Sequence, residues 1–557
     1  MMSQPTLQDT ISQGETLTVE FKSDRGPLDD AELIGTVVCL ANGQGGLLLV
    51  GVEEDGTVTG LHPSHRTRPE LLGAFIMSRT VPPLTVEVTF ETLSLNSAGE
   101  MIAVLRIPAS PQPIATSDGR VLVRFLDTRG QPGCRPLYPH EMASWRGSRG
   151  QADMTAMSVP GSTWDDLDTL GFARLRHLAE ENRGDAALLN LSDQEIARAL
   201  TLVRMEDGRW TPTLAGMLLI GKEIALRQHV PAHEVAFQVL RGLDVAVNDF
   251  HRWPLLRIHE WLMQAIDVRN EEQELMVNGF RVGVPRYDRR GLREAINNAL
   301  IHRDYTQLGA VHVQLHDDHA LITNPGGFVL GVQADRLLVT SPRPRNPVLA
   351  DAFKRIGLVE RTGRGVSIIY AGQLRNGRPV PRYERSTDVN VTVVLDSRPA
   401  DLNFVLLTIR ANRQLGRALG VDDLLPLWEL WHRGAVNATA LAPVLQKGVD
   451  DTAEVLAALV AANLLEVDGQ VYRLKLELHA EAELRAGQVP RDPASAVLAY
   501  VLGHGRITRR EVVDLCGVNE NQAAYLLKTL VERGELRLVG RGRSARYELG
   551  KVAGNSE

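Results

Sequence analysis

Apolar and polar residues alternate along the first part of the chain, a pattern typical of strands that bury one face. The alternating or wholly apolar runs lie at 14–22, 45–52, 84–90, 101–107 and 121–125, and a helical period covers 29–41. Several strands grouped around one helix predict an α+β sheet domain over residues 1–146. The Gly- and Ser-containing residues 147–160 then predict a linker.

A helical period dominates the next segment. It covers 165–182, 192–200, 211–222 and 254–268, and one strand-like run lies at 235–240. Helices with this period bury an apolar stripe against a neighbouring element. The pattern predicts a helical connector over residues 161–276.

The C-terminal half combines two further patterns. A strand-like run at 311–322 is flanked by helical segments. The Glu294/Asn298 helix and the glycine motifs at 326–327 and 363–365 resemble a nucleotide-binding fold, and this resemblance implies an α/β sandwich over residues 277–396. Short helices followed by a hairpin then occur twice, over 400–480 and 490–551, and each set predicts a winged helix. The expected fold class is therefore multidomain α+β, with a sheet domain, a helical connector, a sandwich and two winged helices.

Composition restricts the classes of function. The chain has 557 residues, enough for about three to five domains. Its formal net charge of −7 argues against a uniformly basic surface, so any contact with nucleic acid is expected to be local. No apolar run approaches the roughly 20 residues that span a bilayer, and we expect a cytoplasmic protein without membrane contact.

The chain has three cysteines, Cys39, Cys134 and Cys516, which are far apart in the sequence. No two of them have the spacing of a metal site or of a redox-active pair. We therefore expect reduced, structural thiols, as in most cytoplasmic proteins.

The most informative segment is Gly291–Tyr305, which has a helical period. Glu294 and Asn298 are four residues apart in it, so their side chains lie next to each other on one helix face. Asn298 offers a hard oxygen ligand for Mg²⁺ beside triphosphate oxygens, and Glu294 can polarise an attacking water. The pair predicts an ATPase site, with ATP and Mg²⁺ as the cofactors.

Two glycine motifs follow this helix. The first ends a strand-like run with a turn that lets backbone approach a ligand closely. The second precedes an apolar segment, where free backbone N–H groups at the start of a helix can bind phosphate. The candidate ligand-binding residues are Asn324, Gly326 and Gly327 in the first motif and Gly363, Arg364 and Gly365 in the second.

The Glu/Asn helix and the two glycine motifs, in this order, resemble the nucleotide-binding fold of the gyrase, heat-shock chaperone, histidine kinase and MutL superfamily. The resemblance covers about Val277 to Leu395, and it is to the divergent branch found in predicted transcriptional regulators. It implies that Glu294 is the catalytic base and that Asn298 binds magnesium.

The same resemblance places a mobile lid at 331–354, between the glycine motifs. Arg343, Arg345 and Arg364 are then candidates for phosphate contacts. Where the superfamily usually has an Asp that accepts from the adenine amino group, this chain has Asn324. An Asn carbonyl can accept from that amino group and its amide can donate to a ring nitrogen, so ATP remains the expected nucleotide.

The N-terminal domain resembles the Schlafen AlbA-type domain, usually described as a DNA-binding module. The resemblance rests on an ordered set of short motifs: Glu15, Glu20-Phe21-Lys22, Ala41-Asn42, Gly46, Gly51–Gly56 and Val123–Arg129. It implies binding to DNA. The candidates for phosphate contacts are Lys22, Arg124 and Arg129.

This domain leaves an alternative open, because members of the wider Schlafen group use acidic residues for metal-dependent RNA cleavage. Three carboxylates can hold a divalent ion that activates water. The simpler interpretation is that Glu20 pairs with Lys22 or Arg124 and that the later acids form a solvated turn. The candidate carboxylates are Glu15, Glu20, Glu53, Glu54 and Asp55.

The C-terminal winged helix carries local positive charge that the whole chain lacks. Between Gly503 and Lys551 there are ten Lys and Arg against six Asp and Glu. In a helix-turn-helix, the second helix enters the major groove with its N-terminal residues at base edges. The expected base contacts are Asn519, Asn521 and Gln522, and the expected phosphate or minor-groove contacts are Arg541, Arg543 and Arg546.

The corresponding helix of the first winged helix is acidic, with Asp450, Asp451 and Glu454, which indicates packing against protein. The order of the domains resembles predicted transcriptional regulators with an ATP-binding domain. We therefore expect an ATP-responsive DNA-binding protein with weak ATPase activity, RNA as a second candidate ligand, and a homodimer by analogy with related folds. Two alternatives remain: a metal-dependent nuclease that uses the N-terminal carboxylates, and a protein-interaction scaffold with an inactive nucleotide fold.

Overall fold

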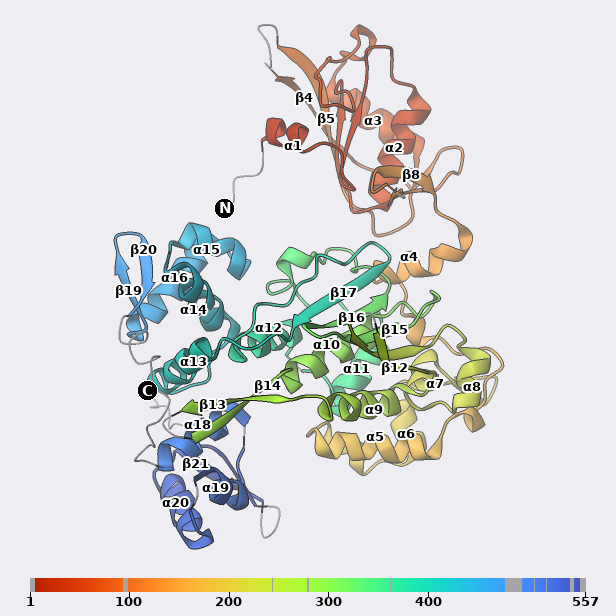
Figure 1. The fold of residues 1–557 in the computed structure, drawn as a ribbon. Coiled ribbons are helices and arrows are strands. Elements are labelled where there is room, and N and C mark those ends of the chain that lie inside the picture. The colour runs from red at the N-terminus through yellow and green to blue at the C-terminus, as the bar shows by residue number, and fades with distance from the viewer. Residues whose placement is uncertain are drawn as a thin grey trace, which may run out of the picture.

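The structure is a computed structural model that describes residues 6–93, 99–127, 129–242, 244–277, 280–360, 362–475, 493–504, 506–516, 518–540 and 545–550. Helices and strands are mixed along the chain and the sheets are open, so the expected multidomain α+β fold class is confirmed (Figure 1). Among the described residues, no helix has the length and apolar character needed to span a bilayer.

The N-terminal domain is built on a four-stranded sheet in the order β1-β2-β5-β4. β1 is parallel to β2, and the other two pairs are antiparallel. Helix α2 packs on this sheet and begins after Asp29, whose side chain accepts hydrogen bonds from the first turn. The bounds are α1 (Leu7–Gln13), β1 (Val19–Lys22), α2 (Asp30–Asn42), β2 (Gly46–Val50), α3 (Pro69–Arg79), β3 (Thr80–Val81), β4 (Glu87–Leu93), β5 (Glu100–Ile107), β6 (Ala115–Thr116), β7 (Leu122–Leu126) and β8 (Pro132–Pro136).

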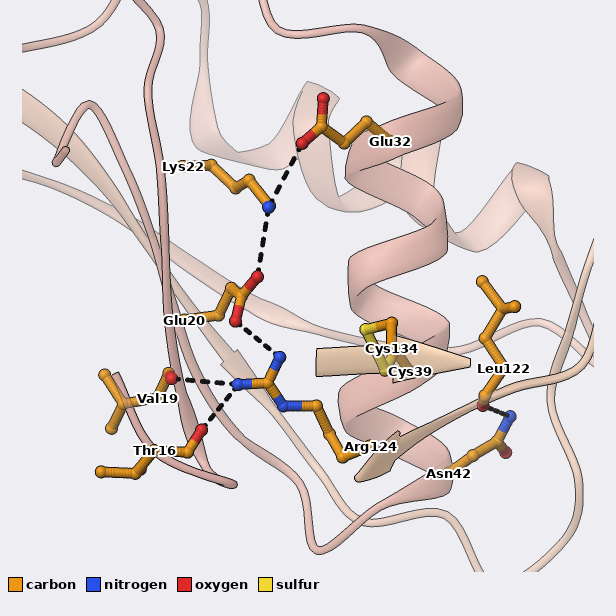
Figure 2. Close-up of a disulfide and its surroundings, with 10 residues drawn as sticks. All are labelled: Thr16, Val19, Glu20, Lys22, Glu32, Cys39, Asn42, Leu122, Arg124 and Cys134. Carbon is orange, nitrogen blue, oxygen red and sulfur yellow. Dashed lines mark hydrogen bonds and ion pairs between the residues drawn. A yellow bond between two sulfur atoms is a disulfide. The ribbon is translucent and has the colours of Figure 1, made fainter. Parts of the chain in front are cut away.

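A disulfide joins Cys39 of α2 to Cys134 of β8 (Figure 2). The two Cα atoms are 6.0 Å apart, although 95 residues separate them in the sequence. The hairpin of β7 and β8 packs on α2 and brings the two thiols together. The expectation of reduced thiols is therefore wrong for this pair, because the pairing depends on a contact between elements that are distant in the chain. Cys516 is a free thiol.

The central domain contains a five-stranded sheet in the order β12-β11-β15-β16-β17. β11 is parallel to β15, and the other pairs are antiparallel. Helix α10 packs on β15, β16 and α12. The bounds are α5 (Thr169–Glu181), α6 (Asp193–Ala199), β9 (Val203–Glu206), β10 (Arg209–Pro212), α7 (Leu214–Ile220), α8 (Glu223–His229), β11 (Val235–Arg241), β12 (Asp244–His251), α9 (Leu255–Asp267), β13 (Glu272–Val277), β14 (Phe280–Pro285), α10 (Arg289–His302), β15 (Val311–Leu315), β16 (His319–Pro325), α11 (Pro347–Ile356), α12 (Gly365–Arg375) and β17 (Asn390–Asp396).

The core of this domain corrects the boundary that the sequence predicted at residue 276. β11 lies before that boundary, yet it pairs with β15 beyond it, and one hydrophobic core runs from Val159 to Leu395. The helices of the expected connector bury their apolar stripes in this same core. Periodicity reveals the elements, but pairing between strands that are distant in the sequence leaves no local signature.

Residues 147–160 are not a free linker either. Helix α4 (Met142–Ser148) crosses the predicted domain end at 146, and Thr155 is fully buried. The side chain of Asp153 accepts a 2.7 Å hydrogen bond from the backbone N–H of Val348, at the start of α11. The segment is therefore packed against the central domain.

Two further units follow the central domain. The first C-terminal unit, residues 402–475, shares a hydrophobic core with α12, and the second, residues 493–550, has a core of its own. The described part of each holds the helices and the small antiparallel sheet that the pattern predicted. The bounds are α13 (Leu402–Leu415), α14 (Val421–Arg433), β18 (Ala435–Val436), α15 (Ala438–Leu445), α16 (Val449–Ala461), β19 (Leu465–Asp468), β20 (Val471–Leu474), α18 (Pro493–His504), α19 (Arg509–Cys516), α20 (Glu520–Glu532), β21 (Leu536–Val539) and β22 (Arg546–Leu549).

We expect the disulfide to be detectable by differential alkylation. When the unreduced protein is unfolded in denaturant, a thiol reagent should modify one cysteine, Cys516, because the other two are oxidised. After reduction, all three should react. The mass of the intact protein measures the number of labels, and the Cys516→Ser variant should take up none without reduction. Three labels on the unreduced wild type would contradict the disulfide.

Candidate functional site

Helix α10 is the element that carries the predicted catalytic pair. It begins after Asp288, whose side chain accepts a 2.6 Å hydrogen bond from the backbone N–H of Gly291. Most of the helix is buried between the sheet and α12, and Asn298 is half-buried beside a cavity. The rigid core around α10 therefore fixes which of its side chains can meet a ligand.

The cavity beside Asn298, called here the first cavity, lies between α10, the sheet and α12. Its volume is about 150 Å³. Much of its wall is apolar, formed by Ala295, Ala299, Ile322, Val366, Ile369, Val391 and Val393. Its main polar side chains are Asn298, His302, Asn324, Arg343, Arg345 and Tyr383.

The first glycine motif lines one end of this cavity. Gly326 has a φ of +92°, a conformation that favours glycine. At Gly327 a Cβ atom would collide with the backbone carbonyl of Asp388. Asn324 precedes them at the end of β16 and is almost completely buried. The structure thus brings Asn298, Asn324 and Gly327 to one cavity.

The second glycine motif lies at the start of α12. Gly363 has a φ of +75°, and Gly365 is the first residue of the helix. A Cβ atom on Gly365 would collide with a carboxylate oxygen of Glu294, so the motif packs directly over that side chain. Arg364 is exposed and does not line the first cavity.

Glu294 does not share the first cavity with Asn298. It lines a second cavity, formed with Arg183, Arg290, Arg293 and Glu360 among others. Gly365 lies against Glu294 while the next residue, Val366, lines the first cavity, so the start of α12 separates the two. The sequence predicted that Glu294 and Asn298 meet in one site, but the structure places them in different cavities. Spacing along a helix does not show which other segment packs between two side chains.

Burial also changes the chemistry of Glu294, which is 4 % exposed. It raises the pKa of this carboxyl to about 7, although Arg293 and the backbone of Glu360 act in the opposite direction. A carboxyl with a pKa near the working pH can exchange a proton readily, as a general base must.

The lid, defined here as residues 328–346, runs from the first glycine motif to α11 and differs from the bounds predicted at 331–354. Helix α11 begins at Pro347, so the part without regular structure other than one short turn ends at Asn346. The amide of Asn346 donates to the carbonyl oxygens of Ile301 and Arg303, at 2.7 and 2.8 Å. The lid is thereby fastened to the end of α10.

Arg345 connects this lid to the first glycine motif. Its guanidinium lies 3.4 Å from Asp304 Oδ2 and donates to the carbonyl oxygen of Gly327 at 2.8 Å. Both members of the ion pair are buried, with Asp304 3 % and Arg345 6 % exposed. Arg343, by contrast, is exposed and donates to the carbonyl of Leu330 at 3.3 Å.

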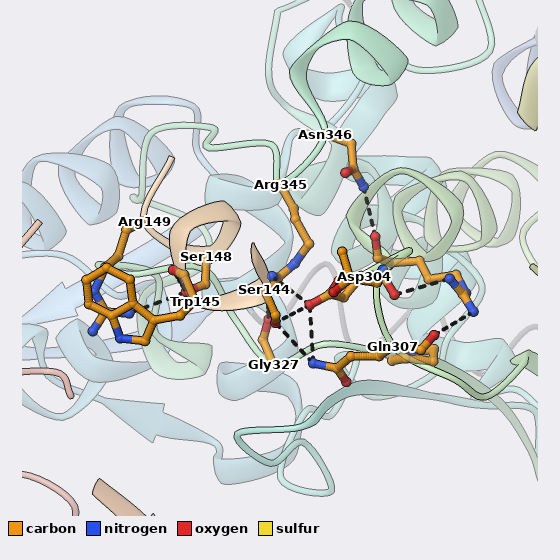
Figure 3. Close-up of polar contacts among 12 residues, drawn as sticks. Ser144, Trp145, Ser148, Arg149, Asp304, Gln307, Gly327, Arg345 and Asn346 are labelled. Carbon is orange, nitrogen blue, oxygen red and sulfur yellow. Dashed lines mark hydrogen bonds and ion pairs between the residues drawn. The ribbon is translucent and has the colours of Figure 1, made fainter. Parts of the chain in front are cut away.

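Helix α4 joins the N-terminal domain to this network (Figure 3). Ser144 donates to Asp304 Oδ2, and the carbonyl of Ser148 accepts a 2.8 Å hydrogen bond from the backbone N–H of Leu330 in the lid. Toward the N-terminal domain, Trp145 donates to the carbonyl of Asn42 at 3.0 Å. No local pattern of residues predicts this role for α4.

Arg149 strengthens the contact of α4 with the N-terminal domain. Its guanidinium donates to the carbonyls of Asn42, Gly43 and Ser110 and lies 3.8 Å from the ring centroid of Trp145. A short helix is therefore bonded to the N-terminal domain on one side and to the wall of the first cavity on the other.

In the N-terminal domain, two predicted phosphate contacts are used in internal ion pairs (Figure 2). Glu20 Oε1 lies 3.1 Å from Lys22 Nζ, and Glu20 Oε2 lies 2.5 Å from Arg124 Nη1. The simpler interpretation of the sequence proposed these two pairings. The side chain of Arg124 is 2 % exposed and also donates to the carbonyl of Thr16. Arg124 is thus not presented to DNA, whereas Arg129 lies exposed in the turn between β7 and β8.

The N-terminal carboxylates have different hydrogen-bond partners. Glu15 accepts a hydrogen bond from the backbone N–H of Phe21 at 2.8 Å, and Glu53 accepts from Ser23 and Thr59. Glu54 and Asp55 are exposed. Within the described ranges, no three His, Cys, Asp or Glu side chains form a group that could hold a metal ion. The geometry of the described residues therefore does not favour the nuclease alternative.

Two of the three predicted base contacts form the cap of α20 in the second C-terminal unit. Asn519 Oδ1 accepts from the backbone N–H of Gln522, and Gln522 Oε1 accepts from that of Asn519. Asn521 is exposed, and so are Tyr525 and Lys528 on the same face of the helix. Tyr525 is 75 % exposed and is a further candidate for a contact with DNA. It lies four residues after Asn521, so helix spacing could have predicted that it shares this face.

The structure describes one of the three predicted wing contacts, Arg546. Arg546 lies 3.5 Å from Glu548 within β22 and is largely covered. Arg541 and Arg543 lie outside the described residues. Glu548 also contacts Arg183 of the central domain at 3.2 Å, so the second C-terminal unit rests against the rim of the second cavity.

Comparison with known families finds three matches, each covering less than half of the chain. The Schlafen AlbA_2 family matches residues 15–131. The HATPase_c_4 family, described as "Putative ATP-dependent DNA helicase recG C-terminal", matches residues 309–395. A domain of unknown function, DUF8451, matches residues 144–236. The chain therefore contains a Schlafen AlbA_2 domain and a RecG-like ATPase-type domain, which confirms these two expectations.

Among curated proteins, none matches the chain. Among solved structures, the chain is similar to the crystal structure of the DIP2311 protein from Corynebacterium diphtheriae. The identity is 22 %, the TM-score is 0.49, and the alignment covers 98 % of this chain and 99 % of that one.

The raised pKa of Glu294 predicts a specific dependence of stability on pH. A buried carboxyl that prefers its protonated form stabilises the fold fully below pH 4.5, and this contribution is lost as the pH rises through about 7. The loss is about 3 kcal/mol. Thermal unfolding at pH 5 and pH 8 measures it, and Glu294→Gln should lack this part of the pH dependence.

The exposed Glu54 provides a matched control for this experiment. Glu54→Gln removes the same charge from a solvated site and should behave like the wild type. If Glu294→Gln retained the pH dependence of the wild type, Glu294 would not be the titrating group.

Proposed function

We propose that this protein binds DNA in a manner that responds to ATP, and that it acts as a transcriptional regulator. The AlbA_2 and HATPase_c_4 domains support a DNA-binding, ATP-related protein. One observation supports the proposal that DNA binding responds to ATP. The lid of the first cavity contacts both α4 and the first C-terminal unit. A ligand that closes this lid is thereby linked to two other parts of the chain.

The residues of the first cavity fit a nucleotide. Its apolar walls suit a base, and the start of α12 provides backbone N–H groups for phosphate. Asn298 supplies the amide oxygen that would hold Mg²⁺, and Arg343 lies in the lid with its charge exposed. The metal ion, when bound, would neutralise charge on the phosphate oxygens.

Hydrolysis would need Glu294 to reach the first cavity. The start of α12 now lies between them, so this segment must move before Glu294 can accept a proton from an attacking water. A base that reaches its site only after such a movement fits a slow ATPase. Because the pKa of Glu294 is about 7, its basic form increases as the pH rises through neutrality.

The lid offers the route by which nucleotide could act on DNA binding. On one side, the backbone N–H of Leu330 is bonded to Ser148 of α4, which holds the AlbA_2 domain. On the other side, the backbone N–H of Leu338 donates to Gln446 of the first C-terminal unit at 2.7 Å. We infer that lid closure changes how the exposed Arg129 and Tyr525 are presented to DNA. A homodimer, RNA as a ligand and a cytoplasmic location stay predictions from the sequence.

Substitutions on α10 should separate binding from hydrolysis. Glu294→Gln keeps the shape of the side chain but removes the proton acceptor, so phosphate release should fall by about 10²–10⁴-fold while nucleotide binding is kept. Asn298→Ala removes the oxygen ligand and should weaken Mg²⁺-dependent binding itself. Calorimetry with Mg-ATP, repeated with EDTA, and a phosphate-release assay measure the two effects. Absence of Mg-ATP binding to the wild type would refute the proposed function.

A second experiment tests the link through α4. Mg²⁺ with a nonhydrolysable ATP analogue should change the affinity for a fluorescent DNA duplex of mixed sequence by roughly fivefold or more. Ser144→Ala removes the hydrogen bond to Asp304 and should reduce this change, while DNA affinity without nucleotide stays within about twofold. Fluorescence anisotropy measures both affinities.

The matched control is Ser148→Ala in the same helix. The Ser148 hydroxyl donates within α4 to Trp145, and the carbonyl that meets the lid is kept in the variant. Ser148→Ala should therefore respond to nucleotide as the wild type does. If the wild type showed no response, or both variants lost it equally, the proposed route through Ser144 would be wrong.

A further inference from the structure

The two ends of the first cavity differ in chemistry. Gly365 packs on Glu294 just outside the cavity, near the start of α12, and Asn298 and then His302 of α10 line the cavity itself. His302 shares the far end with Asn324 and Gly327 of the first glycine motif. His302 is eight residues after Glu294, which is about 12 Å along a helix. With phosphate at the start of α12, a base bound in this cavity lies at the end formed by His302 and Asn324.

Asn324 and His302 are polar side chains at this end that can form hydrogen bonds with a base; Arg345 also lies there, and its guanidinium is bonded to Asp304 and to the carbonyl of Gly327. In β16, Asn324 pairs in register with Val391 of β17, so the strand wall next to it is apolar. Its amide donates a 3.2 Å hydrogen bond to the carbonyl of Pro325. His302 lines the cavity one turn after Asn298.

Both side chains can donate as well as accept. An Asn amide carries a carbonyl oxygen and an NH₂ group, and a neutral imidazole has one N–H and one acceptor nitrogen. His302 is neutral at physiological pH, because burial and then the charge of Arg345 lower its pKa to about 4. If the Asn324 amide rotates or His302 changes its tautomer, each side chain can meet either a donor or an acceptor of the ligand.

No ionised carboxylate is available to select adenine. None of the described residues that line the cavity is Asp or Glu. The nearby Asp304 is occupied: Oδ1 accepts from Thr306, and Oδ2 accepts from Ser144, Gln307 and Arg345. A carboxylate accepts only, and it would repel the O6 oxygen of guanine. The base end lacks this means of rejecting guanine.

From this geometry we propose that the first cavity accepts either purine, so that the protein binds GTP as well as ATP. The inference rests on the nucleotide site proposed above and specifies its ligand class. Adenine presents an N6 amino donor beside the N1 acceptor, whereas guanine presents the O6 acceptor beside the N1 donor. Asn324 and His302 can satisfy each pair by exchanging the roles of donor and acceptor.

Competition against a fluorescent ATP analogue tests this proposal with Mg-ATP, Mg-GTP and Mg-CTP. The dissociation constants of ATP and GTP should agree within about tenfold, and CTP should bind more than tenfold more weakly than either. A GTP affinity more than tenfold below that of ATP, or CTP binding as tight as ATP, would overturn it while leaving nucleotide binding intact. If none of the three bound, the proposed function itself would fail.

A substitution should create the discrimination that the wild type lacks. Asn324→Asp introduces an acceptor that cannot donate, and it should weaken GTP relative to ATP by about ten- to hundredfold. Asn390→Asp is the matched control, since Asn390 lies beside Pro325 in the register of β16 and β17 but does not line the cavity. It should weaken both nucleotides equally or not at all. An unchanged ratio in a folded Asn324→Asp protein would contradict base reading by Asn324, and the wild-type ratio decides the proposal if that variant does not fold.

Discussion

A single buried carboxylate, that of Asp304, joins the parts of this protein that would have to move together. It accepts from Ser144 of α4, pairs with Arg345 of the lid and follows directly on α10. A buried charge is stable only when it is paired and hydrogen-bonded, and removing one partner of such a pair costs about 3–5 kcal/mol. The α4 helix, the lid and the first glycine motif are therefore held in one arrangement around it.

This arrangement explains why the floor of the first cavity is rigid while its lid can change position. Its floor belongs to the largest hydrophobic core, which is closely packed and resists continuous deformation. Its lid is held by polar contacts that Leu330, Leu338, Arg345 and Asn346 of the lid make with neighbouring elements. Hydrogen bonds of this kind can be exchanged for contacts with a ligand at small net cost, so the lid is the part on which a ligand can act.

Several features of the site were readable from residue spacing, and others were not. Asn298 faces the predicted cavity because helix period and burial agree there. His302 could have been found by the same period, since it is one further turn along the face. Glu294 could not be placed correctly, because Gly365, distant in the sequence, packs between it and the cavity. Arg124 and Lys22 offered the same charge from sequence, yet only packing decided that Arg124 is buried against Glu20.

The sequence by itself determined the local elements, the mixed α+β class, the two ordered glycine motifs and the AlbA_2 and ATPase-type domains, because each depends on short-range period or on motifs of a few residues. The tertiary structure alone decided the shared core across residue 276, the disulfide between Cys39 and Cys134, and the bonding of α4 to both of its neighbours. These features arise from contacts between segments far apart in the chain, and such contacts follow from the packing of the whole fold rather than from any local pattern of residues.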